Sequence, residues 1–231
     1  MIISTDYREN GKFGAGWYTG AIESSALKNE NGNALCDGFS QAGGYFEVRC
    51  RVPATCGNWA AFWLMPDSNF ANDTFGTGED GAEINVFEST FMYWTEHQNL
   101  VTHAVHIDGY GDELKSLGSN YMEIENLYTE FHTFALLWDD SGYTFYIDGA
   151  KIWHTKDATD TVCKVSTYLL LSCEAAGVTE DGVPFPGQQR DEETGEWIEH
   201  WAGTPEDNDK SQPYDFVVDY VKVYAPRTAE A

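Results

Sequence analysis

The chain has 231 residues, 42% of them hydrophobic and 15% aromatic, which is enough to bury a substantial core as one domain. Its formal net charge of -25, with only 13 basic residues, would repel nucleic-acid backbones and anionic membrane surfaces, so we expect neither as a partner. No stretch approaches the roughly 20 apolar residues that span a bilayer, and the first residues lack the pattern of a signal peptide.

Short β-rich runs recur along the chain between clusters of Gly, Asn, Asp and Pro. They lie at 16–22, 44–52, 59–65, 82–89, 100–108, 132–139, 143–148, 167–175 and 216–224. Because no long segment keeps a helical period, this pattern is typical of an antiparallel β-sandwich. A single turn of helix is expected at 157–162. The long irregular stretch 177–213 has the length of a functional or disordered loop.

The five cysteines are too few for a disulfide scaffold in a chain of this length. Cys50 and Cys173 alternate with polar neighbours in predicted strands, which favours small side chains in the core. If a disulfide forms, we expect it between Cys163 and Cys173.

The most informative stretch is Gly-Ala-Glu-Ile-Asn-Val-Phe-Glu-Ser at 81–89. Strict alternation would expose Phe87 and bury Glu88. A one-residue bulge at Val86 and Phe87 removes both faults, and it aligns three polar side chains on the open face: Glu83, Asn85 and Glu88. Two glutamates on one face of a strand fit a catalytic carboxylate pair, although such a spacing also occurs by chance on solvated faces.

This strand resembles the active-site strand of glycoside hydrolase family 16, whose bulged signature is Glu-x-Asp-x-x-Glu, with Asn85 in place of the aspartate. Similarity extends over nearly the whole chain. Residues 44–53 are similar to the family's Tyr-Gly-x-Phe-Glu-x-Arg strand, and 59–66 to its Trp-Pro-Ala-Phe-Trp-Leu strand. Residues 132–149 resemble its hairpin "His-Thr-Tyr-x-x-x-Trp, then Phe-Tyr-x-Asp-Gly", and 218–224 its last strand. The resemblance implies a concanavalin A-like β-jelly roll, two antiparallel sheets with a concave substrate cleft.

The resemblance also assigns catalytic roles. Glu83 is expected to be the nucleophile of a retaining glycosidase, and Glu88 the general acid that later acts as base. The charge of Glu83 should raise the pKa of Glu88. Asn85 can donate an amide hydrogen to Glu83 but cannot hold a proton, so we expect reduced activity or an altered pH optimum.

Further positions are candidates for substrate binding. Resemblance places Glu47 and Arg49 in the glycone subsites, with a cross-strand ion pair as the alternative. Trp59 and Trp63 match sugar-stacking platforms, with burial in the core as the alternative. His106 matches a position in the cleft near the catalytic subsite.

The alternation of polar and apolar residues adds weaker candidates. Glu174 alternates with apolar neighbours and lines the acceptor side or is an ordinary surface residue. Trp94, together with Tyr93, follows the catalytic strand closely and is expected on a loop at the rim of the cleft. His103 has the opposite parity to His106 and fits the core. Trp138 fits the core and the cleft equally well.

Other expectations concern cofactors, the start of the chain and the location of the protein. No cofactor is required and no catalytic metal is expected, but family members often hold a structural calcium ion, here partly through Asp219. The single domain at 1–231 appears without the strand or strands with which family members usually open. The loss would leave an edge strand unpaired beside the C-terminal strand. By family analogy the protein is extracellular.

The resemblance implies an endo-β-glucanase that hydrolyses β-1,3- or mixed-linkage β-1,3-1,4-glucan, and the net charge weighs against sulfated polymers. The alternative is a catalytically weakened or inactive, lectin-like protein that binds β-glucan on the same fold. Glu83 and Glu88 favour the enzyme, since a pure binder has no need of two close carboxylates that repel each other.

Overall fold

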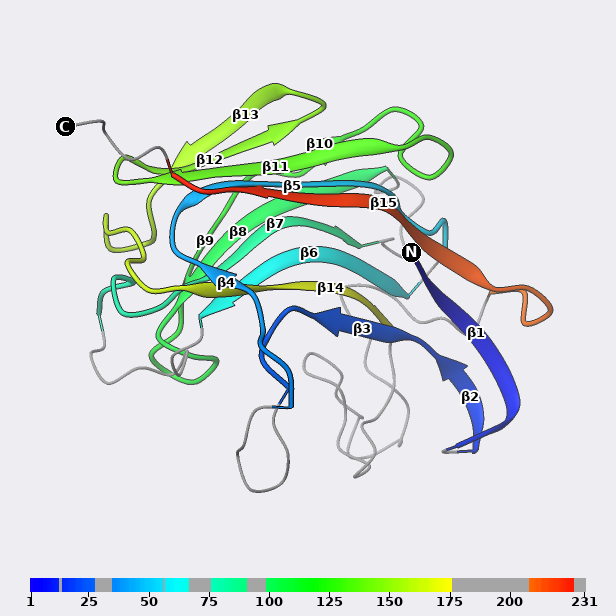
Figure 1. Cartoon of the computed structure of the whole chain (residues 1–231). Helices are drawn as coiled ribbons and strands as arrows, with labels where there is room; N and C mark the ends of the chain where they lie inside the picture. The colour runs from blue at the N-terminus through cyan, green and yellow to red at the C-terminus, as the bar shows by residue number, and fades with distance from the viewer. Residues whose placement is uncertain are drawn as a thin grey trace.

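The computed structural model describes residues 1–12, 14–27, 35–55, 57–66, 76–90, 99–175 and 208–226. These residues form strands and turns without an α-helix, arranged as two antiparallel sheets (Figure 1). The fold is therefore the predicted all-β sandwich. The helical turn expected at 157–162 is instead a turn in which Asp160 N donates to Asp157 O (3.1 Å). The described residues contain no helix that is long and apolar enough to cross a membrane.

One sheet has seven strands. Their order is β13 (Ala150–Thr155), β12 (Gly142–Ile147), β11 (His132–Asp139), β5 (Gly44–Arg51), β15 (Tyr214–Tyr224), β1 (Ile2–Gly11) and β2 (Gly14–Tyr18). β15 pairs with β1 on one side and with β5 on the other. The expectation of an unpaired edge beside the C-terminal strand is therefore wrong, because β1 fills that place and the edges of the sheet are β2 and β13.

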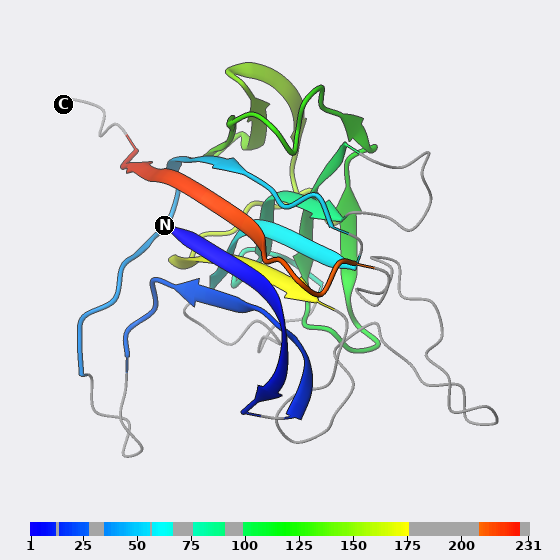
Figure 2. The same cartoon turned by 90° about the vertical axis from the view of Figure 1, so that its right-hand side faces the viewer.

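The other sheet has eight strands. The main order is β10 (Met122–Glu123), β8 (Leu100–Ile107), β7 (Glu83–Thr90), β6 (Asn58–Pro66), β14 (Thr167–Ala175) and β3 (Gly20–Glu23). Two short strands lie off this path, where β4 (Ser40–Gln41) pairs with β14 and β9 (Lys115–Gly118) pairs with β8. In the view turned by 90°, β15 (red) and β14 (yellow) lie in different layers (Figure 2).

The core fills the space between the two sheets. The ring of Phe87 on β7 stacks on Phe134 of β11 with centroids 4.2 Å apart and meets Phe216 of β15 edge-on at 6.2 Å. All three rings are fully buried. These contacts join the eight-stranded sheet to two strands of the other sheet. The apolar area that they bury stabilises the packing of β7 against β11 and β15.

The cysteines and Trp138 belong to this core. Cys50 and Cys173 are buried free thiols, as predicted. Cys163 is also a buried free thiol, so the conditional pair with Cys173 is not formed. Trp138 is 2% exposed and donates its indole N–H to Cys163 O (3.2 Å), which places it in the core and not in a cleft.

Candidate active site

A β-bulge in β7 creates the site. On β6, Phe62 lies opposite Phe87 and the next residue, Trp63, lies opposite Asn85, so Val86 is the extra residue. The same shift separates Asn85 from Glu88 in the register with β8. The bulge is thus where the sequence predicts it. His103 of β8 is buried, stacks on Phe145 at 4.7 Å, and hydrogen-bonds through Nδ1 to Val86 O (2.6 Å).

The bulge turns two sets of side chains in opposite directions. Ile84, Val86 and Phe87 point into the core and are fully buried. Glu83, Asn85 and Glu88 lie on the outer face of the eight-stranded sheet, which is the face directed away from the core. Because a bulge adds one residue to one strand, it brings the otherwise out-of-phase Glu88 to the same side as Glu83.

Neighbouring strands complete this outer face. The register places Glu83 opposite His106 of β8, and Glu88 between Thr102 of β8 and Ala61 of β6. Asn85 lies between Ala104 and Trp63. Ala61 beside Glu88 and Ala104 beside Asn85 have small side chains, so they project little from this face of the sheet.

The Glu83 carboxylate is 7% exposed and has a partner on each oxygen. Asn85 Nδ2 donates to Oε1 (3.1 Å), and the Tyr110 hydroxyl donates to Oε2. His106 Nε2 is 4.0 Å from Oε1. The amide donation expected from Asn85 is therefore confirmed, and the carboxylate is held by neighbours from β7 and from the turn after β8.

Glu88 is 8% exposed, and its pKa is raised to about 7. Burial is the main cause, and the negative charge of Glu83 adds to it. The Asn85 amide and the Trp59 indole oppose the shift because they stabilise the carboxylate. The expected effect of Glu83 is confirmed in direction, but burial is the larger cause. At neutral pH a large fraction of Glu88 therefore carries the proton that a general acid needs.

Trp59 and Trp63 lie on the outer face, half-buried, and are not core residues. Trp63 Nε1 donates to Ser172 Oγ of β14 (3.1 Å). Trp59 lies opposite Glu174 of β14 in the register. Two indoles on the same side as the carboxylates can provide flat apolar surfaces for sugar rings.

Glu174 lies near the carboxylate pair and is not an ordinary surface residue. Its pKa is raised to about 7, chiefly by burial, while a hydrogen bond from Ser172 opposes the shift and the charge of Glu83 adds to it. His106 also lies in the site, beside Glu83. Burial lowers its pKa in spite of Glu83, and its Nδ1 lies 2.7 Å from Ser116 Oγ.

Glu47 and Arg49 do not reach this site, so the expectation that they line it is wrong. Their strand, β5, pairs with β11 and β15 in the seven-stranded sheet, and they lie on the side of it opposite the core residues Phe46 and Val48. Alternation predicts the side of a strand correctly, but it does not reveal which sheet the strand joins.

Both side chains have partners on that distant face. Arg49 pairs with Asp219 of β15 at 2.6 Å, which is the cross-strand ion pair considered as the alternative. Glu47 accepts hydrogen bonds from Tyr45 and Tyr220, both at 2.9 Å. Their contacts stabilise the seven-stranded sheet and are independent of the carboxylate pair.

The ion pair of Arg49 also concerns the structural calcium ion that the family resemblance implies, because that ion was expected partly at Asp219. Asp219 directs its carboxylate at a guanidinium, and among the described residues no group of His, Cys, Asp or Glu side chains is arranged to hold a metal ion. The ion pair with Arg49 thus offsets the negative charge of Asp219 that a cation would need.

Sequence reasoning missed Tyr110. It follows Asp108 and Gly109, which both have positive φ (66° and 75°) and form the turn after β8. The Asp-Gly pair just beyond His106 was the available signal. Trp94 and Tyr93 lie outside the described residues.

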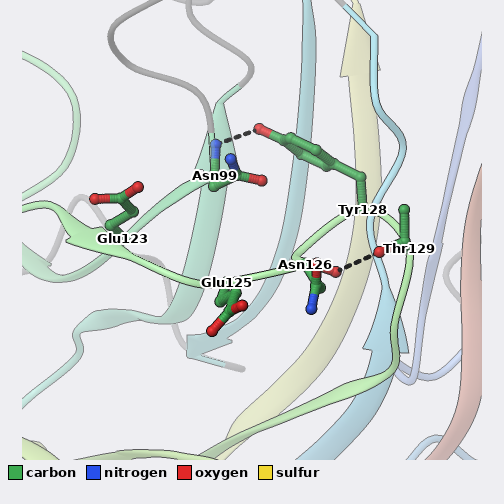
Figure 3. Close-up of a pocket in the computed structure, with 6 residues that line it drawn as sticks. All are labelled: Asn99, Glu123, Glu125, Asn126, Tyr128 and Thr129. Atoms are coloured by element: carbon green, nitrogen blue, oxygen red, sulfur yellow. Dashed lines mark hydrogen bonds between the residues drawn. The ribbon is translucent and has the colours of Figure 1, made fainter.

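A separate polar pocket of about 560 Å³ lies near the start of β8 (Figure 3). It is lined by Asn99, Glu123, Glu125, Asn126, Tyr128 and Thr129. Asn99 N donates to the Tyr128 hydroxyl (2.8 Å), and Thr129 Oγ1 donates to Asn126 O (3.3 Å). None of the candidate catalytic residues lines this pocket.

Comparison with known proteins places these observations in a family. A family model described as glycosyl hydrolases family 16 matches residues 18–199. The chain is 25% identical over 187 residues to the endo-1,3-1,4-beta-glycanase ExsH of Rhizobium meliloti (strain 1021), covering 81% of this chain and 31% of that protein. It is 22% identical over 192 residues to a beta-glucanase of Rhodothermus marinus, covering 78% and 57%. The chain thus spans less than two thirds of either relative.

Solved structures share the fold. The catalytic domain of an endo-1,3-beta-glucanase (laminarinase) from Thermotoga petrophila RKU-1 has a TM-score of 0.63 at 17% identity, covering 98% of this chain and 77% of that one. A family 16 protein from a Bacteroides ovatus mixed-linkage glucan locus, in complex with a G4G4G3G product, also has a TM-score of 0.63, at 18% identity, covering 96% and 80%. Both have the β-jelly roll described above.

Proposed function

The chain belongs to glycosyl hydrolase family 16, and on that premise we propose that it is a retaining endo-β-glucanase. The observation that carries the proposal is the carboxylate pair on the bulged strand. Glu83 and Glu88 share the outer face of β7, and Glu88 has a pKa of about 7. Two glutamates in different environments can divide the roles of nucleophile and acid.

In the proposed first step, Glu88 donates its proton to the glycosidic oxygen as the bond to the anomeric carbon breaks. A Glu83 oxygen attacks that carbon from the opposite side and forms a glycosyl–enzyme ester, while the remainder of the chain leaves as an alcohol. Glu88, now ionised, then removes a proton from water. The water oxygen attacks the anomeric carbon, and the Glu83 carboxylate is released with the original configuration at the anomeric carbon.

We propose β-1,3- or mixed-linkage β-1,3-1,4-glucan as the substrate. The support comes from the names of two relatives, an endo-1,3-1,4-beta-glycanase and a beta-glucanase, and from the residues around the carboxylates. Trp59 and Trp63 suit uncharged sugar rings. Glu174 adds a third carboxylate, so the site would repel an anionic polymer.

The test is the release of reducing sugar from laminarin, barley β-glucan, lichenan, carboxymethyl cellulose and xyloglucan, with Glu83→Gln as the matched control. Activity on laminarin or on a mixed-linkage glucan that is lost in the variant would support the proposal and rank the linkages. Binding to one glucan without hydrolysis of any would contradict it, and would favour the lectin-like alternative with Asn85 as the suspected cause.

A further inference from the structure

The two oxygens of the Glu83 carboxylate are held by two different elements. Asn85, on β7 itself, donates to Oε1 at 3.1 Å, and Tyr110, in the turn after β8, donates to Oε2. His106 could supply a positive charge here, because its Nε2 lies 4.0 Å from Oε1 of Glu83. Burial lowers the pKa of the His106 ring, however, so near neutral pH the ring is mainly uncharged. Neutral donors on opposite sides therefore set the rotation of this carboxylate.

The turn that carries Tyr110 is itself anchored. Asp108, at its start, is 2% exposed and accepts hydrogen bonds from Lys115 Nζ (2.9 Å) and from Gly76 N (3.0 Å). The turn closes with a hydrogen bond from Leu114 N to Gly111 O (3.1 Å). The backbone at Tyr110 is thus tied to β9 and to the segment that precedes β7, so its hydroxyl meets Glu83 at a defined place.

Tyr110 is 66% exposed as a residue, while its hydroxyl end lies against the buried carboxylate. Burial of that end, followed by the charge and the hydrogen bond of Glu83, raises the pKa of the phenol. The hydroxyl therefore keeps its proton through neutral and mildly alkaline pH and remains a donor to Glu83.

We propose that Tyr110 is a positioning residue that holds the Glu83 carboxylate in the orientation for attack on the anomeric carbon. The inference rests on the proposed function, since it gives Glu83 the role of nucleophile. A carboxylate with a single donor on Oε1 can rotate about its terminal bond. With the second donor on Oε2, it presents the same oxygen to the substrate in each turnover.

The test compares Tyr110→Phe with Tyr224→Phe. Both tyrosines are exposed, at 66% and 56%, but Tyr224 lies at the end of β15 in the other sheet. Loss of one hydrogen bond to a charged group predicts a kcat about tenfold lower for Tyr110→Phe, with KM within about twofold. Tyr224→Phe should match the wild type in both constants, and thermal unfolding should show that both variants are folded. An unchanged kcat, or a change in KM alone, would overturn the proposal.

A second readout isolates the nucleophile. The probe is a 2-deoxy-2-fluoro oligoglucoside with a dinitrophenyl leaving group, which departs without a proton from Glu88. Mass spectrometry follows the bonding of the fluorosugar to Glu83, so the labelling rate measures only the attack of Glu83 on the anomeric carbon. We expect labelling to be about tenfold slower in Tyr110→Phe than in wild type or Tyr224→Phe. Equal rates would overturn the role of Tyr110 only. A wild type that is not labelled and hydrolyses no glucan would overturn the proposed function and this inference with it.

Discussion

The side-chain amide of Asn85 donates a hydrogen bond of 3.1 Å to Oε1 of Glu83, in a position that is 4% exposed. The neutral amide lets two ionisable glutamates share one short strand without a third charge between them. An aspartate at 85 could make the same contact only while protonated, because an ionised one would face another carboxylate at hydrogen-bonding distance.

For Asn85→Asp we therefore predict a changed pH dependence. An added negative charge near Glu88 should raise the pKa of Glu88 further and move the alkaline limb of kcat/KM upward by about one pH unit. The measurement is kcat/KM from pH 4 to 9 on the glucan that the wild type hydrolyses fastest. Superimposable profiles for Asn85→Asp and wild type would contradict this role of Asn85.

The wild type should lose activity on the alkaline side near neutrality. Glu88 must be protonated to act as an acid, and its pKa is about 7, so kcat/KM should fall about tenfold for each pH unit above that value. Glu174→Gln is the control, because removing its charge should move the limb slightly to lower pH. A profile that stays flat to pH 9 would argue against Glu88 as the acid.

Glu88 should also weaken the fold at high pH. Its folded pKa of about 7 lies above the ordinary value of 4.5, so the folded chain binds this proton more tightly than the unfolded chain. Its contribution to stability is full below pH 4.5 and is lost as the pH rises through 7. Glu88→Gln stays neutral and should be more stable than wild type by up to about 3 kcal/mol at pH 8, with little difference at pH 4.

Urea unfolding at pH 4, 6 and 8 checks this prediction. The matched control is Glu9→Gln, an exposed glutamate of β1, which should change stability by less than about 0.5 kcal/mol at each pH. A difference between Glu88→Gln and wild type that does not grow with pH would contradict the raised pKa of Glu88.

Substrate affinity should depend on the outer face of the eight-stranded sheet and not on β5. Trp63→Ala removes an indole beside Asn85 and should raise KM about tenfold. Glu47→Gln, on the far face of the other sheet, should leave KM within about twofold of wild type. Initial rates over a range of glucan concentrations measure both. A large rise in KM for Glu47→Gln would return that residue to the glycone subsites.

Much of the fold follows from local patterns. The nine β-rich runs predicted from the sequence all fall on strands, and the run at 16–22 is divided between β2 and β3. The strands without a predicted run are β1, β4, β9, β10 and β13. β4, β9, β10 and β13 are short or largely exposed, and so have no apolar alternation to detect.

The carboxylate strand is the clearest case of local determination. A period of two, interrupted by one out-of-phase glutamate, requires a bulge near Val86, because no other arrangement keeps Phe87 in the core and brings Glu88 beside Glu83. Alternation also set Glu174 apart from its apolar neighbours, whereas Trp59, Trp63 and His106 became candidates for the cleft through the family resemblance.

Tertiary structure decided which of these sides meet. Arg49 and Trp63 both point away from the core on neighbouring segments of the chain, yet β5 pairs with β11 and β15, whereas β6 pairs with β7 and β14. Tyr110 reaches Glu83 only because a turn of positive φ is anchored by Lys115 and Gly76. Alternation is a property of one strand, but pairing partners are chosen by contacts between residues far apart in the sequence, which no local pattern contains.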